Sequence, residues 1–331
     1  MNTGSGAPER ARTRVLAIVG PTAAGKSAVA MRIAERLDAE IVSADSRQIY
    51  RGLDIGTAKP SADDRRRVPH HLLDVADPDQ RFDAARFRHL ALAAIAGAAA
   101  RGRPVVVCGG TGLYLRALRH GLFAGPGAVP ELRAALYERE RLHGPGTLHA
   151  DLAAADPAAA SRLHPHDTVR LVRALEVLRV TGRPISAWQD AHAFAETSID
   201  MQVFGCARPR EDLHARIAAR CGAMIDAGLL TEIRELWDRG YGPELPPLDS
   251  VGYREMGAYL RGDLDFAAAC DAFARATRRL AKRQLTWWRS DATIAWFHPD
   301  RDDAAILTRA AAWLSSPCPS PISTSSSPSL R

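Results

Sequence analysis

A run of consecutive residues near the start of the chain carries the clearest chemistry. It consists of Gly20, Pro21, Thr22, Ala23, Ala24, Gly25, Lys26 and Ser27, and it matches the pattern G-x-x-x-x-G-K-[ST] through which many proteins bind ATP. The backbone N–H groups of such a loop surround phosphate oxygens, the lysine adds positive charge, and the serine hydroxyl can bind Mg²⁺. We therefore predict a site for linked phosphates with Ser27 as the metal ligand. The alternative is a glycine turn that only caps a structural helix.

A carboxylate follows the next short apolar run. Residues 41–44 are predicted to form a strand, and Asp45 and Ser46 come directly after it. Wound parallel sheets bind their ligands at the carboxyl ends of the strands, so we expect Asp45 beside the phosphate loop. The residues alone leave three roles open for Asp45, which are a base, a metal ligand and a helix N-cap.

A second glycine turn stands where kinases and ATPases usually carry an acidic residue. Such enzymes hold their metal with an aspartate at the end of another buried strand. Here the apolar run 105–108 leads into residues 109–114, which contain the hydroxyl of Thr111 and no carboxylate. The missing carboxylate argues against a kinase. The turn itself either carries a functional hydroxyl or is an ordinary connection without a chemical role.

Basic and aromatic residues gather in one later segment. No acidic residue occurs from Ala272 to Ser290. The segment contains Arg275, Arg278, Arg279, Lys282, Arg283 and Arg289 beside Trp287 and Trp288. A basic helix face neutralises phosphates, and aromatic rings stack on bases. A nucleic acid is therefore a candidate partner, with an ordinary solvated face as the alternative.

Strand and helix patterns alternate around these residues. The β-branched run 14–20 predicts a strand before the loop, and residues 25–37 predict a helix with Val29, Ile33 and Leu37 on one face. Further strands are predicted at 41–44, 105–108, 201–205 and 293–297. Strands separated by helices are typical of parallel βαβ units, so the predicted fold class is α/β, a P-loop NTPase-like wound parallel sheet.

A helical insertion domain is predicted to interrupt this core. Strand patterns stop between residues 125 and 200, where 131–143 and 168–181 predict helices. The core then has a first part, 14–124, and a second part, 201–314, which ends in a long helix at 265–289. Residues 1–13 and 315–331 are predicted to be disordered tails because they contain few apolar residues.

Composition and charge limit the possible classes of protein. The chain has 331 residues, of which 46% are hydrophobic and 25% charged, as in ordinary globular proteins. A formal net charge of +6 permits an anionic partner. We expect no membrane span and no secretory signal, and hence a cytoplasmic protein. The 5 cysteines form no CxxC pair, so neither disulfides nor structural zinc are expected.

Several longer runs resemble the bacterial tRNA dimethylallyltransferases, also called tRNA isopentenyltransferases. These runs are residues 20–27, 45–60 (DSRQIYRGLDIGTAKP), 69–74, 109–114, 170–177, 251–255 and 276–287. The resemblance covers about residues 14–314 and implies that the loop binds a diphosphate leaving group rather than ATP. The implied reaction moves a dimethylallyl group from dimethylallyl diphosphate to N6 of adenosine 37 in tRNAs that read codons beginning with U. It yields N6-dimethylallyladenosine and diphosphate, and Mg²⁺ is the expected cofactor.

The resemblance also implies roles for single residues. Asp45 would take the proton from the adenine amine, Thr111 would lie near the reacting centre, and Arg216 would stabilise the diphosphate. From the sequence alone, an ordinary solvated arginine on a helix is the favoured interpretation of Arg216. Gln48 would contact the target base, which must be flipped into the pocket.

A larger set is expected to contact tRNA. It consists of Asp45, Ser46, Arg47, Gln48, Thr111, Arg133, Thr168, Val169, Arg170, Leu171, Val172, Ser250, Val251, Gly252, Tyr253, Arg254, Glu255, Lys282, Arg283, Gln284, Leu285, Thr286, Trp287, Trp288 and Arg289. Val169 departs from the family, which usually has glutamine there. His70 and His71 lack metal-ligand spacing, so structural packing or hydrogen bonding is expected of them.

Two other functions remain possible on the sequence. One is a P-loop kinase acting on a small molecule or nucleoside, which would transfer phosphate from ATP. The other is a P-loop protein that binds RNA without catalysis and would leave no altered nucleoside. The enzyme is expected to act as a monomer without an obligate protein partner.

Overall fold

Within residues 12–123, 125–192 and 198–316, which the computed structural model describes, six parallel strands form one sheet. The strands are β1 (Thr13–Val19), β2 (Glu40–Ser43), β3 (His70–His71), β4 (Val105–Cys108), β5 (Ile199–Cys206) and β6 (Ala295–Phe297). Their order across the sheet is β3-β2-β4-β1-β5-β6. The residues from Val15 to Val19 are fully buried, as expected for a parallel strand covered on both faces. The predicted α/β fold is confirmed.

The register of the strands brings four strand ends to one edge of the sheet. Ile18 of β1 lies opposite Cys108 of β4, and Cys108 lies opposite Ser43 of β2. On the other side of β1, Val19 lies opposite Gly205 of β5. The segments that leave β1, β2, β4 and β5 therefore start side by side, and three of them are the segments that carry the predicted chemistry.

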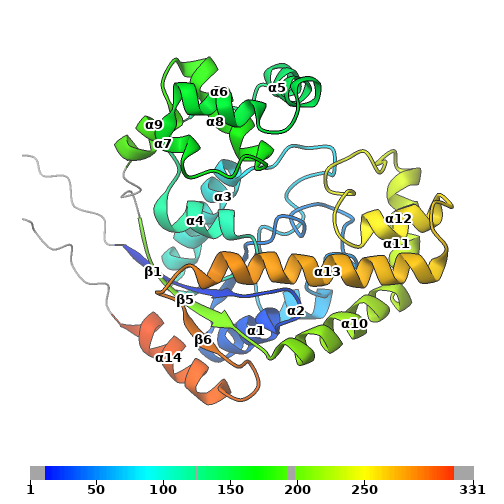
Figure 1. Cartoon of the computed structure of the whole chain (residues 1–331). Coiled ribbons are helices and arrows are strands. Elements are labelled where there is room, and N and C mark those ends of the chain that lie inside the picture. The colour runs from blue at the N-terminus through cyan, green and yellow to red at the C-terminus, as the bar shows by residue number, and fades with distance from the viewer. Residues whose placement is uncertain (1–11, 124, 193–197, 317–331) are drawn as a thin grey trace, which may run out of the picture. The chain divides into compact units, whose positions relative to one another are not determined.

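Helices pack around this sheet and connect its strands. They are α1 (Lys26–Leu37), α2 (Ala62–Arg67), α3 (Ala84–Ala100), α4 (Gly112–His120), α10 (Arg210–Asp226), α11 (Leu229–Asp238), α12 (Tyr253–Leu260), α13 (Phe266–Arg289) and α14 (Asp303–Ser315). Val29 and Ile33 of α1 join Leu16 and Ile18 of β1 in one hydrophobic core. Figure 1 shows α13 as the long orange helix, which packs against α10 and α12.

Residues His120–Glu196 form a compact unit separate from the sheet-bearing unit. Its described part contains only helices, namely α5 (Pro130–His143), α6 (Thr147–Ala155), α7 (Pro157–Ala160), α8 (Thr168–Thr181) and α9 (Ile185–His192). Leu136, Leu148, Leu152 and Leu171 are fully buried in a core of its own. This unit corresponds to the predicted insertion at residues 125–200.

The structure moves several predicted boundaries. Thr13 belongs to β1 because the strand pairs with β5 up to Ile199, so residue 13 is not part of a tail. For the same reason β5 begins at Ile199, two residues before the predicted strand start at 201 and inside the predicted insertion. Ser315 is the last residue of α14 rather than the first of a tail. The rest of both predicted tails, except Arg12 and Ser316, lies outside the described residues.

Candidate active site

The loop between β1 and α1 turns sharply at both ends. Gly20 has a φ of 133° and Gly25 a φ of 101°, which are backbone angles that favour glycine. A Cβ at Gly20 would lie 2.6 Å from the carbonyl oxygen of Cys206 at the end of β5. The turn brings the first N–H groups of α1, which have no acceptor within the helix, to the edge of the sheet. Together with the positive end of the helix they form a place for an anion.

Basic side chains bind the carbonyl oxygens of this loop. The bonds run from Lys26 Nζ to Pro21 O (2.7 Å), from Arg216 Nε to Ala23 O (3.1 Å) and from Arg208 Nε to Ala24 O (2.9 Å). Arg208 is itself held by ion pairs with Asp212 and Asp300. The shape of the loop is therefore fixed by the protein before any ligand arrives, which lowers the entropic cost of binding.

Lys26 supplies a cation in a largely desolvated place. Burial lowers the pKa of its ammonium group, so a nearby anion is needed to favour the charged form. Burial also raises the pKa of Cys108 to about 12 and that of Cys206 to about 11. Both thiols therefore stay protonated at neutral pH, and neither is a nucleophile.

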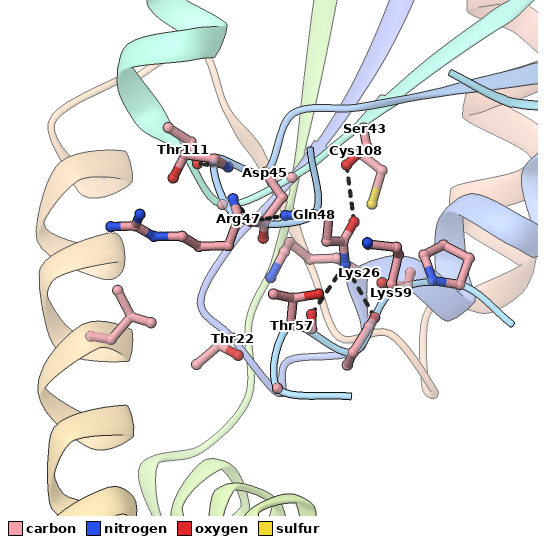
Figure 2. A pocket seen from close by; sticks show the side chains of 18 of the residues that line it. Thr22, Lys26, Ser43, Asp45, Arg47, Gln48, Thr57, Lys59, Cys108 and Thr111 are labelled. Atoms are coloured by element: carbon pink, nitrogen blue, oxygen red, sulfur yellow. Dashed lines mark hydrogen bonds between the residues drawn. The ribbon is translucent and has the colours of Figure 1, made fainter. Parts of the chain in front are cut away.

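A cavity of about 660 Å³ opens beside this loop. It brings together predicted site residues from segments far apart in the sequence, and Figure 2 shows several of them. They are Thr22, Lys26, Ser27, Asp45, Ser46, Arg47, Gln48, Thr111, Ser250, Val251, Arg254, Arg283 and Gln284. The volume is in the range of sites for small ligands, and both an anion site and a carboxylate face it.

The two carboxylate oxygens of Asp45 differ in their surroundings. Oδ1 accepts hydrogen bonds from the backbone N–H groups of Arg47 at 2.8 Å and of Gln48 at 3.4 Å. Among the described residues, Oδ2 accepts no hydrogen bond. Asp45 therefore caps a turn at residues 46–49 and not a helix, because no helix begins in the described residues between β2 and α2. This leaves one oxygen of Asp45 available to a ligand in the cavity.

The glycine turn after β4 holds Thr111 close to this carboxylate. The Thr111 Oγ1 atom accepts a hydrogen bond from the Ser46 N–H at 3.0 Å, and the Thr111 N–H donates to Ala44 O at 3.2 Å. Because Oγ1 acts as the acceptor in its bond to Ser46, the hydroxyl hydrogen remains to be donated to a ligand. Figure 2 shows Thr111 and Asp45 on the same side of the cavity.

Gln48 is already bonded within the protein. Its Nε2 donates to Thr57 O at 3.2 Å and to Ala58 O at 3.1 Å, and its Oε1 accepts from Ser43 Oγ at 3.0 Å. Both amide hydrogens are used in this way. Gln48 can therefore offer a base only the second lone pair of Oε1, unless it gives up one of these bonds.

Two arginines of α10 stand near the phosphate loop, and the sequence singled out one of them. Arg216 is exposed and lines a shallow hollow with Ala23, Lys26 and Ser27, but not the main cavity. Arg220, one helical turn further on, lines both. It forms no hydrogen bond or ion pair with another described residue. Arg220 is thus a second cation facing the anion site, and sequence reasoning missed it.

The sequence did contain a signal for Arg220. Leu213, Ile217 and Arg220 follow the spacing i, i+4, i+7, which places them on one face of α10. Leu213 and Ile217 are buried on that face. An arginine that continues a buried apolar stripe needs an anionic partner, and no acidic residue next to it on this helix face supplies one. A bound anion is then the expected partner.

The structure separates the residues expected to contact tRNA into exposed and buried ones. In the sheet-bearing unit the exposed ones are Arg254, Lys282, Arg283, Thr286 and Arg289. Tyr253, Glu255 and Trp288 are buried, and the Tyr253 hydroxyl donates to Glu232 Oε1 at 2.6 Å. These three side chains are packed inside the protein, so any contact of this segment with RNA would come from its backbone or from exposed neighbours such as Arg254.

The helical unit shows the same separation. Val169 and Arg170 are exposed, whereas Leu171 and Val172 lie in the core of the unit. Arg133 binds the buried carboxylate of Glu176 through Nε at 2.8 Å and Nη2 at 2.9 Å. The structure thus gives Arg133 a structural ion pair, and only its remaining donors can reach a ligand.

The histidine pair has the hydrogen-bonding role that the sequence favoured. The His70 Nδ1 atom lies 2.8 Å from Val68 O, and the His71 Nε2 atom lies 2.6 Å from Glu40 Oε2. Among the described residues, no group of three or more His, Cys, Asp or Glu side chains is arranged to hold a metal ion. Cys108, Cys206, Cys221 and Cys270 are free, and Cys318 lies outside the described residues.

Of the helices in the described part of the chain, none combines the length and the apolar character needed to cross a bilayer.

Comparison with known proteins finds relatives over nearly the whole chain. Residues 48–291 match the family model described as IPP transferase. A tRNA dimethylallyltransferase of Geobacter metallireducens is 48% identical over 301 residues, which are 91% of this chain and 97% of the relative. Another, from Anaeromyxobacter dehalogenans, is 51% identical over 296 residues, which are 89% of this chain and 96% of the relative.

Solved structures agree with these sequence relatives. A tRNA isopentenylpyrophosphate transferase from Bacillus halodurans superposes with a TM-score of 0.68 at 37% identity, covering 92% of this chain and 97% of that one. A eukaryotic dimethylallyltransferase described as acting on tRNA superposes with a TM-score of 0.77 at 25% identity, covering 91% of this chain and 78% of the other.

Proposed function

The chain belongs to the IPP transferase family, and on that premise we propose the reaction that its cavity performs. It transfers a dimethylallyl group from dimethylallyl diphosphate to N6 of adenosine 37 in tRNAs that read codons beginning with U. The products are N6-dimethylallyladenosine in the tRNA and free diphosphate. The family and its relatives at about half identity, which are named tRNA dimethylallyltransferases, support a prenyl transfer to tRNA.

One observation carries the proposal. Asp45, whose Oδ2 accepts no hydrogen bond from a described residue, lines the same cavity as Lys26 and Ser27 at the start of α1, so a candidate base and an anion site share one chamber. β4 ends in a glycine turn with a hydroxyl and no carboxylate, where phosphate-transferring relatives of the loop keep an acid. The cavity therefore suits a reaction in which the phosphates leave and an amine is deprotonated.

Each bond change has a residue of this chain beside it. The C–O bond to the diphosphate breaks, and its electron pair leaves with the diphosphate oxygen. The C–N bond to adenine N6 forms, and the N6 proton passes to Asp45 Oδ2. Lys26, Arg220 and the N–H groups at the start of α1 stabilise the charge that grows on the diphosphate. Thr111 can donate its hydroxyl hydrogen to an oxygen or nitrogen at the reacting centre.

The residues around the loop also fit Mg²⁺. Magnesium prefers oxygen ligands, keeps several waters and often binds through few protein groups together with substrate phosphates. The Ser27 hydroxyl is exposed at the start of α1, and the oxygens of a bound diphosphate would complete the set. When bound, the ion would supply positive charge that makes diphosphate a better leaving group.

The rim of the cavity suits the RNA substrate. Arg254 and Arg283 are exposed and also line the cavity. Arg279 and Lys282 are exposed on the same helix as Arg283 and can neutralise further phosphates. An adenine stacked in an RNA loop cannot reach Asp45, so the base must leave the stack and enter the cavity.

The proposed product is tested by nucleoside analysis. Unmodified tRNA transcripts that read codons beginning with U are incubated with the enzyme, Mg²⁺ and dimethylallyl diphosphate, then digested and analysed by mass. We expect adenosine to gain one dimethylallyl group, and a matched transcript with guanosine at position 37 to remain unchanged. Modification of both transcripts would refute the assigned position, and modification of neither would refute the reaction.

A further inference from the structure

Helix α13 presents two different sets of side chains. Lys282, Arg283 and Thr286 are exposed, whereas Gln284 and Trp287 are half-buried and reach the glycine turn that follows β4. The sequence assigns all of these residues to RNA binding. The contacts of Gln284 indicate a different role for this residue.

The side-chain amide of Gln284 connects two loops of the active site. Its Oε1 accepts a hydrogen bond from the Thr22 N–H at 2.8 Å, and its Nε2 donates to Gly110 O at 3.3 Å. These partners fix the orientation of the amide, because a flipped amide would set a donor against the Thr22 N–H. One side chain of α13 thus joins the phosphate loop to the glycine turn.

Glycines in the turn make room for α13. A Cβ at Gly110 would lie 2.2 Å from Nε2 of Gln284, and a Cβ at Gly112 would lie 2.1 Å from Nε1 of Trp287. Either side chain would push the helix away and break the hydrogen bonds of Gln284. The Arg116 guanidinium covers the Trp287 ring at 4.7 Å from its centroid. The turn and the helix are therefore fitted to each other at the place where Gln284 makes its bonds.

We propose that Gln284 is a positioning residue for the phosphate loop and does not contact RNA. It holds the backbone of Thr22, which lines the cavity, in the position from which the loop binds diphosphate. Without it, the Thr22 N–H would lack its protein acceptor, and this part of the loop, which the bonds at Pro21, Ala23 and Ala24 do not hold directly, would have to be ordered by the ligand at a cost in affinity. The inference rests on the proposed function, because it takes dimethylallyl diphosphate as the ligand of this loop.

The first test separates the two faces of α13 with matched variants. Gln284→Met keeps the length of the side chain and removes both hydrogen bonds, whereas Lys282→Met removes an exposed charge two residues away. We expect Gln284→Met to weaken binding of dimethylallyl diphosphate about tenfold and to raise its KM, with kcat and the Kd for tRNA within twofold of wild type. Lys282→Met should weaken tRNA binding alone. Loss of tRNA affinity in Gln284→Met, with diphosphate affinity unchanged, would overturn the inference.

A second measurement needs no ligand. Hydrogen exchange of the full chain, followed by mass spectrometry of the peptide that contains the loop, should be about tenfold faster in Gln284→Met. Gln284→Glu keeps an acceptor for the Thr22 N–H, so the exchange rate of the loop peptide in this variant should lie between the rates in wild type and in Gln284→Met. Unchanged exchange in Gln284→Met at an unchanged Tm would overturn the inference. Failure of wild type to bind dimethylallyl diphosphate would instead contradict the proposed function, and the exchange result would still decide the role of Gln284.

Discussion

The two carboxylate oxygens of Asp45 have different roles. Oδ1 accepts backbone N–H bonds and holds the turn that follows β2, and Oδ2 accepts no hydrogen bond from a described residue. The residue therefore serves as a cap and can serve as a base at the same time. Asparagine would keep a carbonyl oxygen for the cap and would lose the base.

The first prediction uses this separation. Asp45→Asn should bind dimethylallyl diphosphate like wild type and transfer the prenyl group at least about 100-fold more slowly, as expected for the loss of a general base. Single-turnover transfer to tRNA and titration of dimethylallyl diphosphate measure the two effects separately. Near-normal transfer would show that another group takes the proton.

The second prediction concerns the charge of Lys26. Because burial lowers the pKa of Lys26, its proton is lost at a lower pH than that of an exposed lysine. As the pH rises through that lowered pKa, the affinity for dimethylallyl diphosphate should fall, since the cation is lost while the diphosphate stays ionised. Calorimetric titrations between pH 7 and about 10 measure this decline. Lys26→Arg, which stays charged, should lack the decline, and a decline of equal size in that variant would contradict the assignment.

At the scale of elements, the parallel register gathers the ends of the strands, and buried acids hold the segments between them. Glu232 of α11 accepts the N–H groups of Asp54, Ile55 and Gly56 at 3.0, 2.6 and 3.1 Å. The following residues provide the carbonyl oxygens that bind Gln48. Glu40 plays a comparable part at the start of β2, where Arg101, Arg103 and His71 surround its carboxylate.

The third prediction concerns acid stability. The hydrogen bonds from Arg101, and to a smaller extent from His71, lower the pKa of Glu40 to about 2, from an ordinary value of 4.5. A lowered folded-state pKa stabilises the protein at neutral pH, and this stabilisation is lost as the pH falls from about 4.5 toward 2. Glu40→Gln should lower the free energy of unfolding at pH 7 by about 3 kcal/mol and weaken its pH dependence below 4.5. Denaturant titrations at several pH values measure both.

An exposed ion pair provides the control for this prediction. Glu138 and Arg141 pair on the surface of α5, with exposed fractions of 50% and 70%. Glu138→Gln should change the free energy of unfolding little, since surface ion pairs contribute little. If Glu40→Gln and Glu138→Gln lowered the free energy of unfolding equally, burial of Glu40 would not explain its contribution to stability.

The fourth prediction concerns the basic face of α13. Replacing Arg279, Lys282 and Arg283 by alanine should lower tRNA affinity and flatten its dependence on salt, by up to about one unit of slope per lost phosphate contact. Arg36→Ala, an exposed arginine in the last turn of α1, serves as the control. Binding curves at several salt concentrations give the slope, and the same slope in the triple variant and wild type would exclude this face from the interface.

The sequence predicts much of the fold, because the spacing of apolar residues within a segment indicates whether that segment forms a strand or a helix. The strands at Val105–Cys108 and Ile199–Cys206 were found within two residues, whereas the two-residue strand β3 has no pattern of its own. Exposure within a helix was harder to predict. Trp287 and Trp288 are adjacent and alike in type, yet Trp288 is buried and Trp287 packs on the glycine turn. That difference, like the bonds of Gln284, depends on segments more than 150 residues away.

At the scale of the whole molecule, the chain forms two compact units. Every residue that lines the main cavity belongs to the sheet-bearing unit, so the proposed diphosphate site, Asp45 and the basic face of α13 belong to the same unit. The helical unit has a core of its own and exposes Val169 and Arg170. The residues of the proposed reaction that line the cavity thus all belong to one unit.

One measurement tests the central claim most directly, because it follows which fragment is transferred. Two reactions contain the enzyme, unmodified tRNA and Mg²⁺, one with dimethylallyl diphosphate labelled with ¹⁴C in the prenyl group and the other with ATP labelled with ³²P in the γ-phosphate. The account predicts that ¹⁴C becomes covalently attached to tRNA and that ³²P does not. Transfer of ³²P to any acceptor, with the prenyl label left on its diphosphate, would contradict it and identify a kinase.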